Sequence, residues 1–519
     1  MVRSASNFTT TEGPTSEMSG QKASGNVTKD LRRIGARLPA PPGLVLLLVC
    51  LGQFMVILDV SVVNVALPSI RNDLGFSASG LQWVVNAYAL TFAGFLLLGG
   101  RAADLFGRRR LLLAGLALFS LASLLDGIAD SQTMLVAARA LQGLGGAVLT
   151  PATLTILIAT YPEGRARARA LGIWSGVAAA GGASGALLGG VITQFLTWRW
   201  VFFINLPIGI AVLIAASLFV AEGAGNPEGR RHIDLAGAFT VTAGLVAVTW
   251  GIVRSQAAGW GSPEVLGAFA AGTVLLAVFV LVEARLARAP LVPLRIFSSR
   301  SIAGANLVAF GVGAALFSVW YFQSLYLQGV RGMSPLAAGL TFMPQTLAIA
   351  VGSQVSSRLI PRFGARPFLV AGPVLIAAGL LWLAQVSVGP AIWSSVIIPG
   401  ALLTLGAGLA FPAVTIAATA GVARSEAGLA SGVVNTSRQV GGSLGLAGLA
   451  TLAADHAAAL TQVGHSVPMA LTGGFGLGFA GGAAIALAAG VSGLLVPGRT
   501  RRPDSGRRTR SPEVEEAAA

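Results

Sequence analysis

Apolar stretches of about 20 residues recur along the whole chain and are separated by short polar loops. Each stretch is long enough for a helix to cross a hydrocarbon layer of about 30 Å. Of the 519 residues, 54% are hydrophobic and only 11% are charged, whereas soluble domains average about 25% charged residues. We therefore predict an all-α polytopic membrane protein with no interior soluble domain.

The polar loops divide the chain into fourteen predicted helices, flanked by two polar tails. Residues 1–42 and 497–519 are rich in Ser, Thr, Gly, Pro and charge, so we expect both tails to be disordered. The predicted helices span 43–66, 81–100, 111–128, 132–158, 168–191, 199–220, 234–253, 264–283, 301–323, 336–356, 367–386, 392–414, 430–453 and 472–496.

The distribution of Lys and Arg predicts the orientation, because basic residues concentrate in cytoplasmic loops. With both termini in the cytoplasm, nearly all basic residues fall in inner segments, and this split requires an even number of crossings. The only basic residues in outer loops are then Arg71, Arg199, Arg254 and Arg331.

Several classes of function are disfavoured by composition. Cys50 is the only cysteine, so the chain has no internal disulfide. His232, His456 and His465 fall in unrelated predicted loops, which indicates no metal site. No HExxH, paired histidines or Ser–His grouping lies at membrane depth, so we predict no enzyme, no metal and no cofactor. The net charge of +15 is spread over many short loops, which argues against a nucleic-acid partner.

The chain repeats itself at an offset near 260 residues. Matching residues, such as Phe106 and Phe363, follow in the same order across helices two to five and ten to thirteen. Two six-helix bundles with two helices inserted between them give this spacing. We expect an N-terminal bundle over 43–220, a linker with the inserted pair over 221–300, and a C-terminal bundle over 301–496.

Six motifs follow one another in the order of the helices. This set resembles the 14-helix drug:proton antiporters of the major facilitator superfamily, the EmrB/QacA type, over roughly residues 43–496. The motifs are LDVSVVNVALP at 58–68, GRAADLFGRRR at 100–110, RALQGLGGA at 139–147, a run of spaced glycines in the fifth helix, WRWVFFINLPIG at 198–209 and NTSRQVGG at 435–442.

The resemblance implies a fold and a function. The fold is the major facilitator fold, two pseudo-symmetric bundles around a central site. The function is export of drugs, antibiotics or other amphipathic small molecules by proton antiport with alternating access. The implied location is the bacterial cytoplasmic membrane, with the lipid bilayer, protons and a small substrate as partners, and we expect a monomer.

Asp59 and Arg139 are the candidates for proton coupling, because charged groups at membrane depth are costly and mark functional sites. Asp59 lies ~24 Å from the inner start of the first helix, and Arg139 lies ~10 Å from the outer start of the fourth. The helices run in opposite directions, so both residues fall at similar depth in the outer half. We predict that they pair, and that the alternation of this pairing couples proton uptake to transport. Snorkelling of Arg139 to the interface is the alternative. Asp126 and Glu283 lie at the ends of their predicted helices, so we expect both side chains to be solvated.

ATP does not drive transport directly, because the only lysines, Lys22 and Lys29, lie in the N-terminal tail and form no P-loop. An ion gradient is the predicted energy source.

The loop after the second helix is identified, through the resemblance, as a cytoplasmic gate between the bundles. We expect Asp104 to face the positive dipole end of the thirteenth helix, whereas a solvated ion pair is the alternative. The gate residues are Gly100, Asp104, Gly107, Arg108 and Arg109.

The fifth helix carries glycines at four-residue spacing, which lets another helix approach closely. The resemblance identifies this segment as the antiporter motif. The family normally has a proline at the position of Ala186, and its absence argues against strict antiport. The glycines of the motif are Gly172, Gly181, Gly185, Gly189 and Gly190.

Amides and amphipathic aromatics in the helices predict a substrate cavity, because they suit large and mostly apolar ligands. Asp59, Arg139 and Arg438 together leave one excess positive charge in the helix interiors, so neutral or anionic substrates fit as well as cationic ones. Each candidate can equally serve interhelical packing. The candidates are Gln53, Asn64, Trp83, Asn86, Tyr88, Gln142, Trp320, Phe322, Gln345, Asn435, Arg438 and Gln439.

Two transport classes remain as alternatives. A facilitator or proton symporter that imports a small metabolite is favoured by Ala186 and opposed by the helix count and the other motifs. A channel is disfavoured because the sequence has no ring-forming filter motif and a two-part repeat.

Overall fold

The computed structural model describes residues 41–221, 234–287, 290–389, 391–422 and 426–498. Within these residues it is all helical, and 14 helices are long and apolar enough to cross a membrane, as the sequence predicts. The predicted tails lie almost wholly outside the described residues.

The crossings of the first half run from Pro42–Leu74 to a broken sixth crossing. In the sixth crossing, a short α7 and a longer α8 meet at Ile204. The bounds are α2 Pro42–Leu74, α3 Trp83–Phe106, α4 Arg108–Gly127, α5 Gln132–Thr160, α6 Arg165–Phe195, α7 Trp200–Phe203 and α8 Asn205–Phe219.

Two further helices, α9 and α10, precede the second half, where π-helical turns extend several crossings. The α-helical bounds are α9 Leu235–Ala258, α10 Pro263–Leu281, α11 Arg300–Leu325, α12 Pro335–Phe363, α13 Arg366–Leu383, α14 Ile398–Thr419, α15 Ala427–Gln462 and α16 Val467–Ser492. The π-helical turns are η2 Val282–Leu286 after α10, η4 Tyr326–Val330 after α11, and η5 Trp393–Ile397 before α14.

Some helices run beyond their predicted ends. The first was expected to end at residue 66, but α2 continues to Leu74 and passes through Pro68. It stops at Gly75, whose φ of 68° is the left-handed conformation that ends helices and that glycine adopts without a steric cost. The apolar stretch therefore marks the membrane-crossing part of the helix, and the glycine marks its end.

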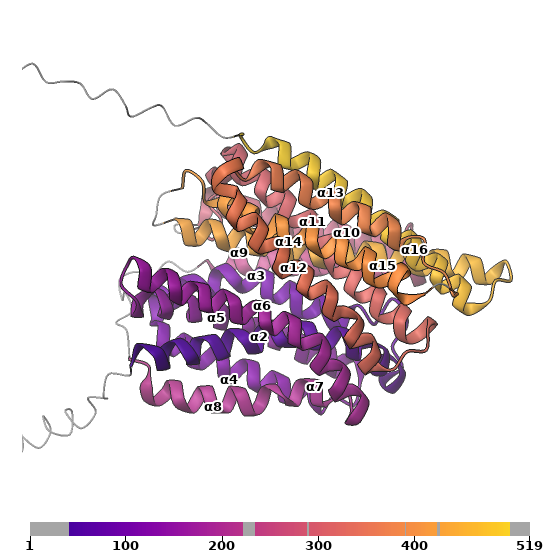
Figure 1. The fold of residues 1–519 in the computed structure, drawn as a ribbon, viewed down its shortest axis with the longest axis horizontal. Coiled ribbons are helices and arrows are strands. Elements are labelled where there is room, and N and C mark those ends of the chain that lie inside the picture. The colour runs from indigo at the N-terminus through magenta and orange to yellow at the C-terminus, as the bar shows by residue number, and fades with distance from the viewer. Residues whose placement is uncertain (1–40, 222–233, 288–289, 390, 423–425, 499–519) are drawn as a thin grey trace, which may run out of the picture.

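The helices gather into two groups, α2 to α8 and α11 to α16, which lie side by side in Figure 1. Contacts within each group follow the same pattern, with α2 against α6 in one and α11 against α15 in the other. Helices α9 and α10 pack on each other, and α9 also contacts α3 and α15, one helix from each group. Because the crossings are even in number, α2 begins and α16 ends at the same side of the bundle, called here the terminal end.

The two groups are hydrogen-bonded to each other toward the opposite side, called here the distal end. Ser324 Oγ of α11 donates to the Asn64 carbonyl of α2 at 2.6 Å. Gln328 Nε2 donates to the Val65 carbonyl at 2.9 Å, and the backbone N–H of Leu336 donates to Gln194 Oε1 at 3.2 Å. These contacts close the distal end.

Toward the terminal end the groups meet where α15 packs against α3. Thr436 Oγ1 of α15 donates to the Ala93 carbonyl of α3 at mid-depth, at 3.4 Å. One turn closer to the terminal end, Leu97 lies against Gly432.

Candidate functional site: a buried ion pair between α2 and α5

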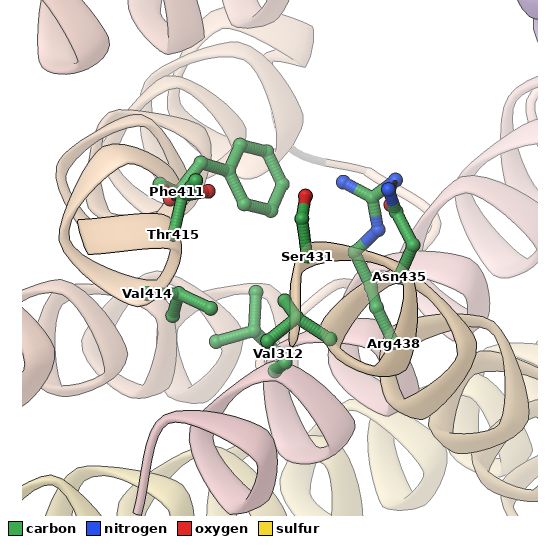
Figure 2. Close-up of a pocket in the computed structure, with 9 residues that line it drawn as sticks. Val312, Phe411, Val414, Thr415, Ser431, Asn435 and Arg438 are labelled. Carbon is green, nitrogen blue, oxygen red and sulfur yellow. Dashed lines mark hydrogen bonds between the residues drawn. The ribbon is translucent and has the colours of Figure 1, made fainter. Parts of the chain in front are cut away.

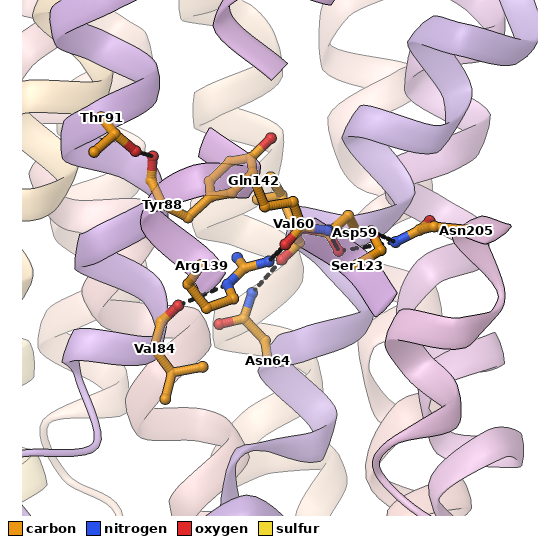
Figure 3. Close-up of polar contacts among 10 residues, drawn as sticks. All are labelled: Asp59, Val60, Asn64, Val84, Tyr88, Thr91, Ser123, Arg139, Gln142 and Asn205. Carbon is orange, nitrogen blue, oxygen red and sulfur yellow. Dashed lines mark hydrogen bonds and ion pairs between the residues drawn. The ribbon is translucent and has the colours of Figure 1, made fainter. Parts of the chain in front are cut away.

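A buried ion pair lies in the middle of the first helical group. Arg139 Nη1 of α5 lies 2.6 Å from Asp59 Oδ2 of α2, and the two side chains are 2% and 0% exposed (Figure 3). The structure therefore brings together the two residues that the sequence predicts to pair. Because Arg139 is buried against Asp59, it does not snorkel to a membrane interface.

Polar side chains from other helices complete the environment of the carboxylate. Gln142 Nε2 and Asn205 Nδ2 donate to Asp59 Oδ1 at 2.8 and 3.1 Å. Both amides also donate to Ser123 Oγ, at 2.8 and 3.3 Å. Gln142 Oε1 in turn accepts a hydrogen bond from Arg139. Four helices, α2, α4, α5 and α8, thus contribute to one network (Figure 3).

The guanidinium of Arg139 is also held from the side of α3. Its Nε donates to the Val84 carbonyl at 2.9 Å. The guanidinium carbon lies 4.5 Å from the ring centre of Tyr88, a cation–π contact, and Phe202 covers it at 5.6 Å. The charge of Arg139 is therefore enclosed by one carboxylate, backbone oxygen and aromatic rings.

This enclosure depends on glycines that let α3 and α4 approach α5. A Cβ on Gly143 would lie 2.3 Å from the Tyr88 carbonyl oxygen, and one on Gly145 would lie 2.7 Å from the Phe119 nitrogen. Both belong to the RALQGLGGA motif. The motif therefore supplies the arginine and also the close packing that brings Val84 and Tyr88 within its reach.

Asp126, at the end of α4, lies close to this network. We expected this residue to be solvated because it sits at a helix end; that expectation is wrong, since it is 0% exposed. Neither of its carboxyl oxygens has a hydrogen-bond partner, and it interacts electrostatically with Arg139 and Asp59. The end of α4 is covered because the Phe203 ring packs against Gly127.

Glu283, expected to be solvated at the end of α10, is also buried, at 5% exposed. Its Oε2 accepts a hydrogen bond from the backbone N–H of Val292 at 3.0 Å. The chain after α10 folds back over this carboxyl group, which the sequence pattern does not reveal.

Ser123 and Asn205 are not among the site residues that the sequence predicts, and Asp126 is expected from the sequence to be solvated. A signal was available, because Ser123 and Asp126 are three residues apart and share one face of an otherwise apolar helix. Asn205 stands alone as an amide within the apolar end of the sixth motif region. Each of these residues lies near one end of its own predicted helix. A position next to a loop suggests an exposed side chain.

The predicted cavity residues of the first group are mostly enclosed. Gln53, Asn86 and Tyr88 are buried, and neither amide atom of Asn86 has a hydrogen-bond partner. Asn64 donates to the Val60 carbonyl of its own helix at 2.9 Å, and Trp83 is half-buried.

The predicted cavity residues of the second group differ in their packing and burial. Phe322 packs between α11 and α16, against Phe475 and Phe479, so its ring fills a helix interface. Gln345 Nε2 donates to Gln323 Oε1 at 2.9 Å. The remaining four stay closer to the face shared with the first group or to a cavity: Trp320, Asn435 and Arg438 are half-buried, and Gln439 is buried.

A cavity of about 60 Å³ lies in the second group between α11, α14 and α15 (Figure 2). Asn435 and Arg438 line it, together with Val312, Val414 and Phe411. Arg438 Nη2 donates to Asn435 Oδ1 at 2.8 Å, and its guanidinium carbon lies 5.4 Å from the Phe411 ring centre.

The predicted gate residues lie at the terminal end of the first group. Gly107 joins α3 to α4 with a φ of 100°, a conformation that side chains rarely adopt. Arg109 Nη2 donates to the Ser217 carbonyl of α8 at 2.5 Å, Arg108 is half-buried, and Gly100 is in ordinary contact with Pro151. The side chain of Asp104 lies outside the described residues, so its predicted contact with the thirteenth helix stays a prediction.

The glycine ridge of α6 packs on α2. A Cβ on Gly185 would lie 2.5 Å from Ser61, and one on Gly189 would lie 2.7 Å from the Val62 carbonyl. Gly181 lies against Phe54 in the same way, whereas Gly172 has no neighbour within 4 Å of such a Cβ.

The same helix also touches the second group. A Cβ on Gly190 would lie 2.7 Å from the Pro335 carbonyl, and the Ala186 carbonyl would lie 2.5 Å from a Cβ on Gly339. Helix α6 runs without interruption through Ala186. The motif thus packs α6 between α2 and α12 at the distal end.

No group of three or more His, Cys, Asp or Glu side chains within the described ranges is arranged to hold a metal ion.

Comparisons with known proteins agree with this geometry. The profile of the Major Facilitator Superfamily matches residues 49–446. The cephamycin export protein CmcT of Amycolatopsis lactamdurans is 43% identical over 463 residues, which covers 89% of this chain and 94% of that protein. The puromycin resistance protein pur8 of Streptomyces alboniger is 38% identical over 473 residues, with coverage of 89% and 92%.

Solved structures share the fold at low identity. A bacterial homolog of the human lysosomal transporter Spinster, in an inward-facing and unoccupied conformation, aligns with a TM-score of 0.60 at 18% identity and covers 88% of this chain and 97% of its own. The POT family transporter PepTSo aligns with a TM-score of 0.64 at 15% identity, with coverage of 88% and 98%. The chain is therefore a multi-pass membrane transporter, not an enzyme, and belongs to the major facilitator superfamily.

Proposed function

We propose that this protein exports antibiotics or other amphipathic small molecules from the cytoplasm by exchange with protons. Relatives that cover most of the chain are named for antibiotic export or resistance, including a cephamycin exporter and a puromycin resistance protein. The Asp59–Arg139 pair carries the proton-exchange part of the proposal, because it is a buried carboxylate whose ionisation depends on one neighbouring guanidinium.

The terminal end is taken as the cytoplasmic side, since the positive-inside distribution of Lys and Arg favours it. The hydrogen bonds at the distal end then close the outer side, and substrate enters from the cytoplasm. In this conformation Asp59 is paired with Arg139. When the outer side opens, Asp59 takes up a proton and the pair separates.

The membrane potential can drive this cycle. One proton charge that moves across 100 mV yields about 2.3 kcal/mol. Because one tenfold step in concentration costs about 1.4 kcal/mol, one proton per cycle supports a gradient of roughly fiftyfold at that potential.

The test uses inverted membrane vesicles in which respiration has acidified the lumen. In an antiporter, a substrate added at the cytoplasmic face releases lumenal protons, which a pH-sensitive dye reports. We expect Asp59→Asn to reduce this release at least about tenfold, because the Asn side chain cannot carry a proton between the two sides.

Asp73→Asn is the matched control, since Asp73 is 46% exposed and pairs with Arg199 near the distal surface, away from the network. We expect its proton release to match the wild type. Unchanged substrate-driven release in Asp59→Asn refutes the role of this carboxyl group. Release that is absent in the wild type while counterflow persists favours a facilitator instead.

A further inference from the structure

We infer that the exported substrate carries a carboxylate group, and that Arg438 and Asn435 bind this group in the cavity of Figure 2. The inference rests on the proposed export function and adds the chemical class of the substrate. It comes from the charges of the second group, which the proton-coupling pair does not involve.

The two arginines inside the helices have opposite surroundings. Arg139 is paired with Asp59 and lies near Asp126, so two carboxyl groups face one guanidinium. Arg438 has no carboxylate partner among the described residues, and its polar contact there is with the amide oxygen of Asn435. The second group therefore presents a guanidinium whose charge the protein does not neutralise.

An unpaired guanidinium at membrane depth is costly, and such groups mark sites that bind an opposite charge. A guanidinium carries five N–H donors in a planar fork that matches the two oxygens of a carboxylate. Arg438 uses one nitrogen for Asn435, and Phe411 covers one face of the group. Figure 2 shows the guanidinium beside Asn435 among the residues that line the cavity.

The cavity is large enough for one functional group of a substrate but not for a whole drug molecule. Its volume of about 60 Å³ compares with about 30 Å³ for one water molecule in the liquid and with about 300–1,000 Å³ for sites that enclose drug-sized ligands. A carboxylate group fits a cavity of this size.

The wall opposite Arg438 is apolar, with Val312 and Val414 beside the hydroxyl groups of Ser431 and Thr415. Thr415 Oγ1 donates to the Phe411 carbonyl of its own helix at 3.1 Å. The cavity thus places one cationic side chain among hydroxyls and apolar carbons. An amphipathic acid, with a carboxylate on a mostly apolar body, matches this lining.

The cavity also lies toward the side of the membrane from which an exporter binds its substrate. Ser431 is in the first turns of α15, which begins at Ala427, and Thr415 is in the last turns of α14, which ends at Thr419. Both positions are toward the terminal end. Under the proposed function this is the cytoplasmic side.

The experiment uses purified full-length protein in proteoliposomes with an imposed proton gradient. The probes are a panel of amphipathic antibiotics in matched pairs, each a carboxylic acid and its methyl ester. We expect the acids to be transported and each ester to be transported at least about tenfold less efficiently, because loss of one charge-assisted contact changes affinity by about that factor.

Variants at Arg438 separate recognition from folding. We expect Arg438→Gln to raise KM for the acids about tenfold or more with little change in kcat, and to leave any residual ester transport unchanged. Arg438→Lys keeps the charge without the planar fork and should retain an intermediate KM. Arg254→Gln, at an exposed pair with Glu264, is the control for loss of an arginine.

The outcomes are distinct from those of the proton-coupling test. Equal transport of acids and esters, or an Arg438→Gln variant with an unchanged acid KM, overturns the carboxylate assignment and leaves proton antiport intact. If Arg438→Gln fails to fold, Asn435→Leu together with Arg438→Lys provides the same comparison.

Discussion

At the scale of single residues, Asp59 is held by hydrogen bonds from three side chains, Arg139, Gln142 and Asn205. Charged partners in a membrane-embedded site leave a large penalty when one of them is removed, about 3–5 kcal/mol for a buried pair.

Asp126 lies close to the same network but, unlike Asp59, has no side-chain donor among the described residues. Its carboxyl group is buried and receives no hydrogen bond from the described residues. An ionised carboxylate without donors is costly in an apolar environment, so we expect Asp126 to be neutral in this conformation.

This expectation has a spectroscopic test. Replacement of Asp126 by Asn removes a neutral acid and adds a neutral amide of nearly the same shape, so the stability should change by less than about 1 kcal/mol. The infrared spectrum of the wild type should contain a protonated-carboxyl stretching band that Asp126→Asn lacks. A spectrum of the variant identical to that of the wild type in this region contradicts the neutral state.

At the scale of helices, glycines decide how closely α5 approaches its neighbours. Gly143 lies against Tyr88 and Thr91 of α3, and a methyl group there would overlap both. The contact is reinforced by Thr91 Oγ1, which donates to the Ala140 carbonyl at 2.9 Å.

We therefore expect Gly143→Ala to destabilise the protein by about 1–3 kcal/mol, the usual cost of overpacking. Gly176→Ala in α6 is the matched control, because its methyl group meets nothing within 4 Å and alanine favours helix formation. Thermal unfolding in detergent compares the two. Equal midpoints for both variants show that the α3–α5 contact is less rigid than described.

At the scale of the whole molecule, hydrogen bonds join the two helical groups at the distal end. Alternating access requires these distal contacts to break in each cycle. The glycine motif of α6 contributes to them through Gly190 and its contact with α12.

Cross-linking across this contact should arrest transport. Cysteines at Gln194 and Leu336, which lie on different groups, can be joined by a short bifunctional thiol reagent. We expect at least about tenfold loss of transport after treatment, because the outer side cannot open. Recovery on cleavage of a reducible linker completes the test.

A cysteine pair at Asp73 and Arg199, both in the first group, is the control for the reagent itself. Full transport by the cross-linked Gln194–Leu336 protein contradicts a cycle that opens the distal end.

The sequence by itself determined the number of crossings and the helical fold, and it placed Asp59 and Arg139 at similar depth. These follow from local properties of the chain. An apolar run of sufficient length forms a crossing, and opposite charges at the same depth on antiparallel helices favour an ion pair. The orientation of the chain and its two-part repeat are further predictions from the sequence.

Only the tertiary structure decided which helix ends are covered. Asp126 and Glu283 look exposed in sequence because each closes a helix, yet Phe203 and the chain around Val292 cover them. The burial of a helix end depends on segments distant in the chain, and no local pattern encodes them. For the same reason, the contrast between a neutralised Arg139 and an Arg438 without a carboxylate partner became visible only once the helices were packed.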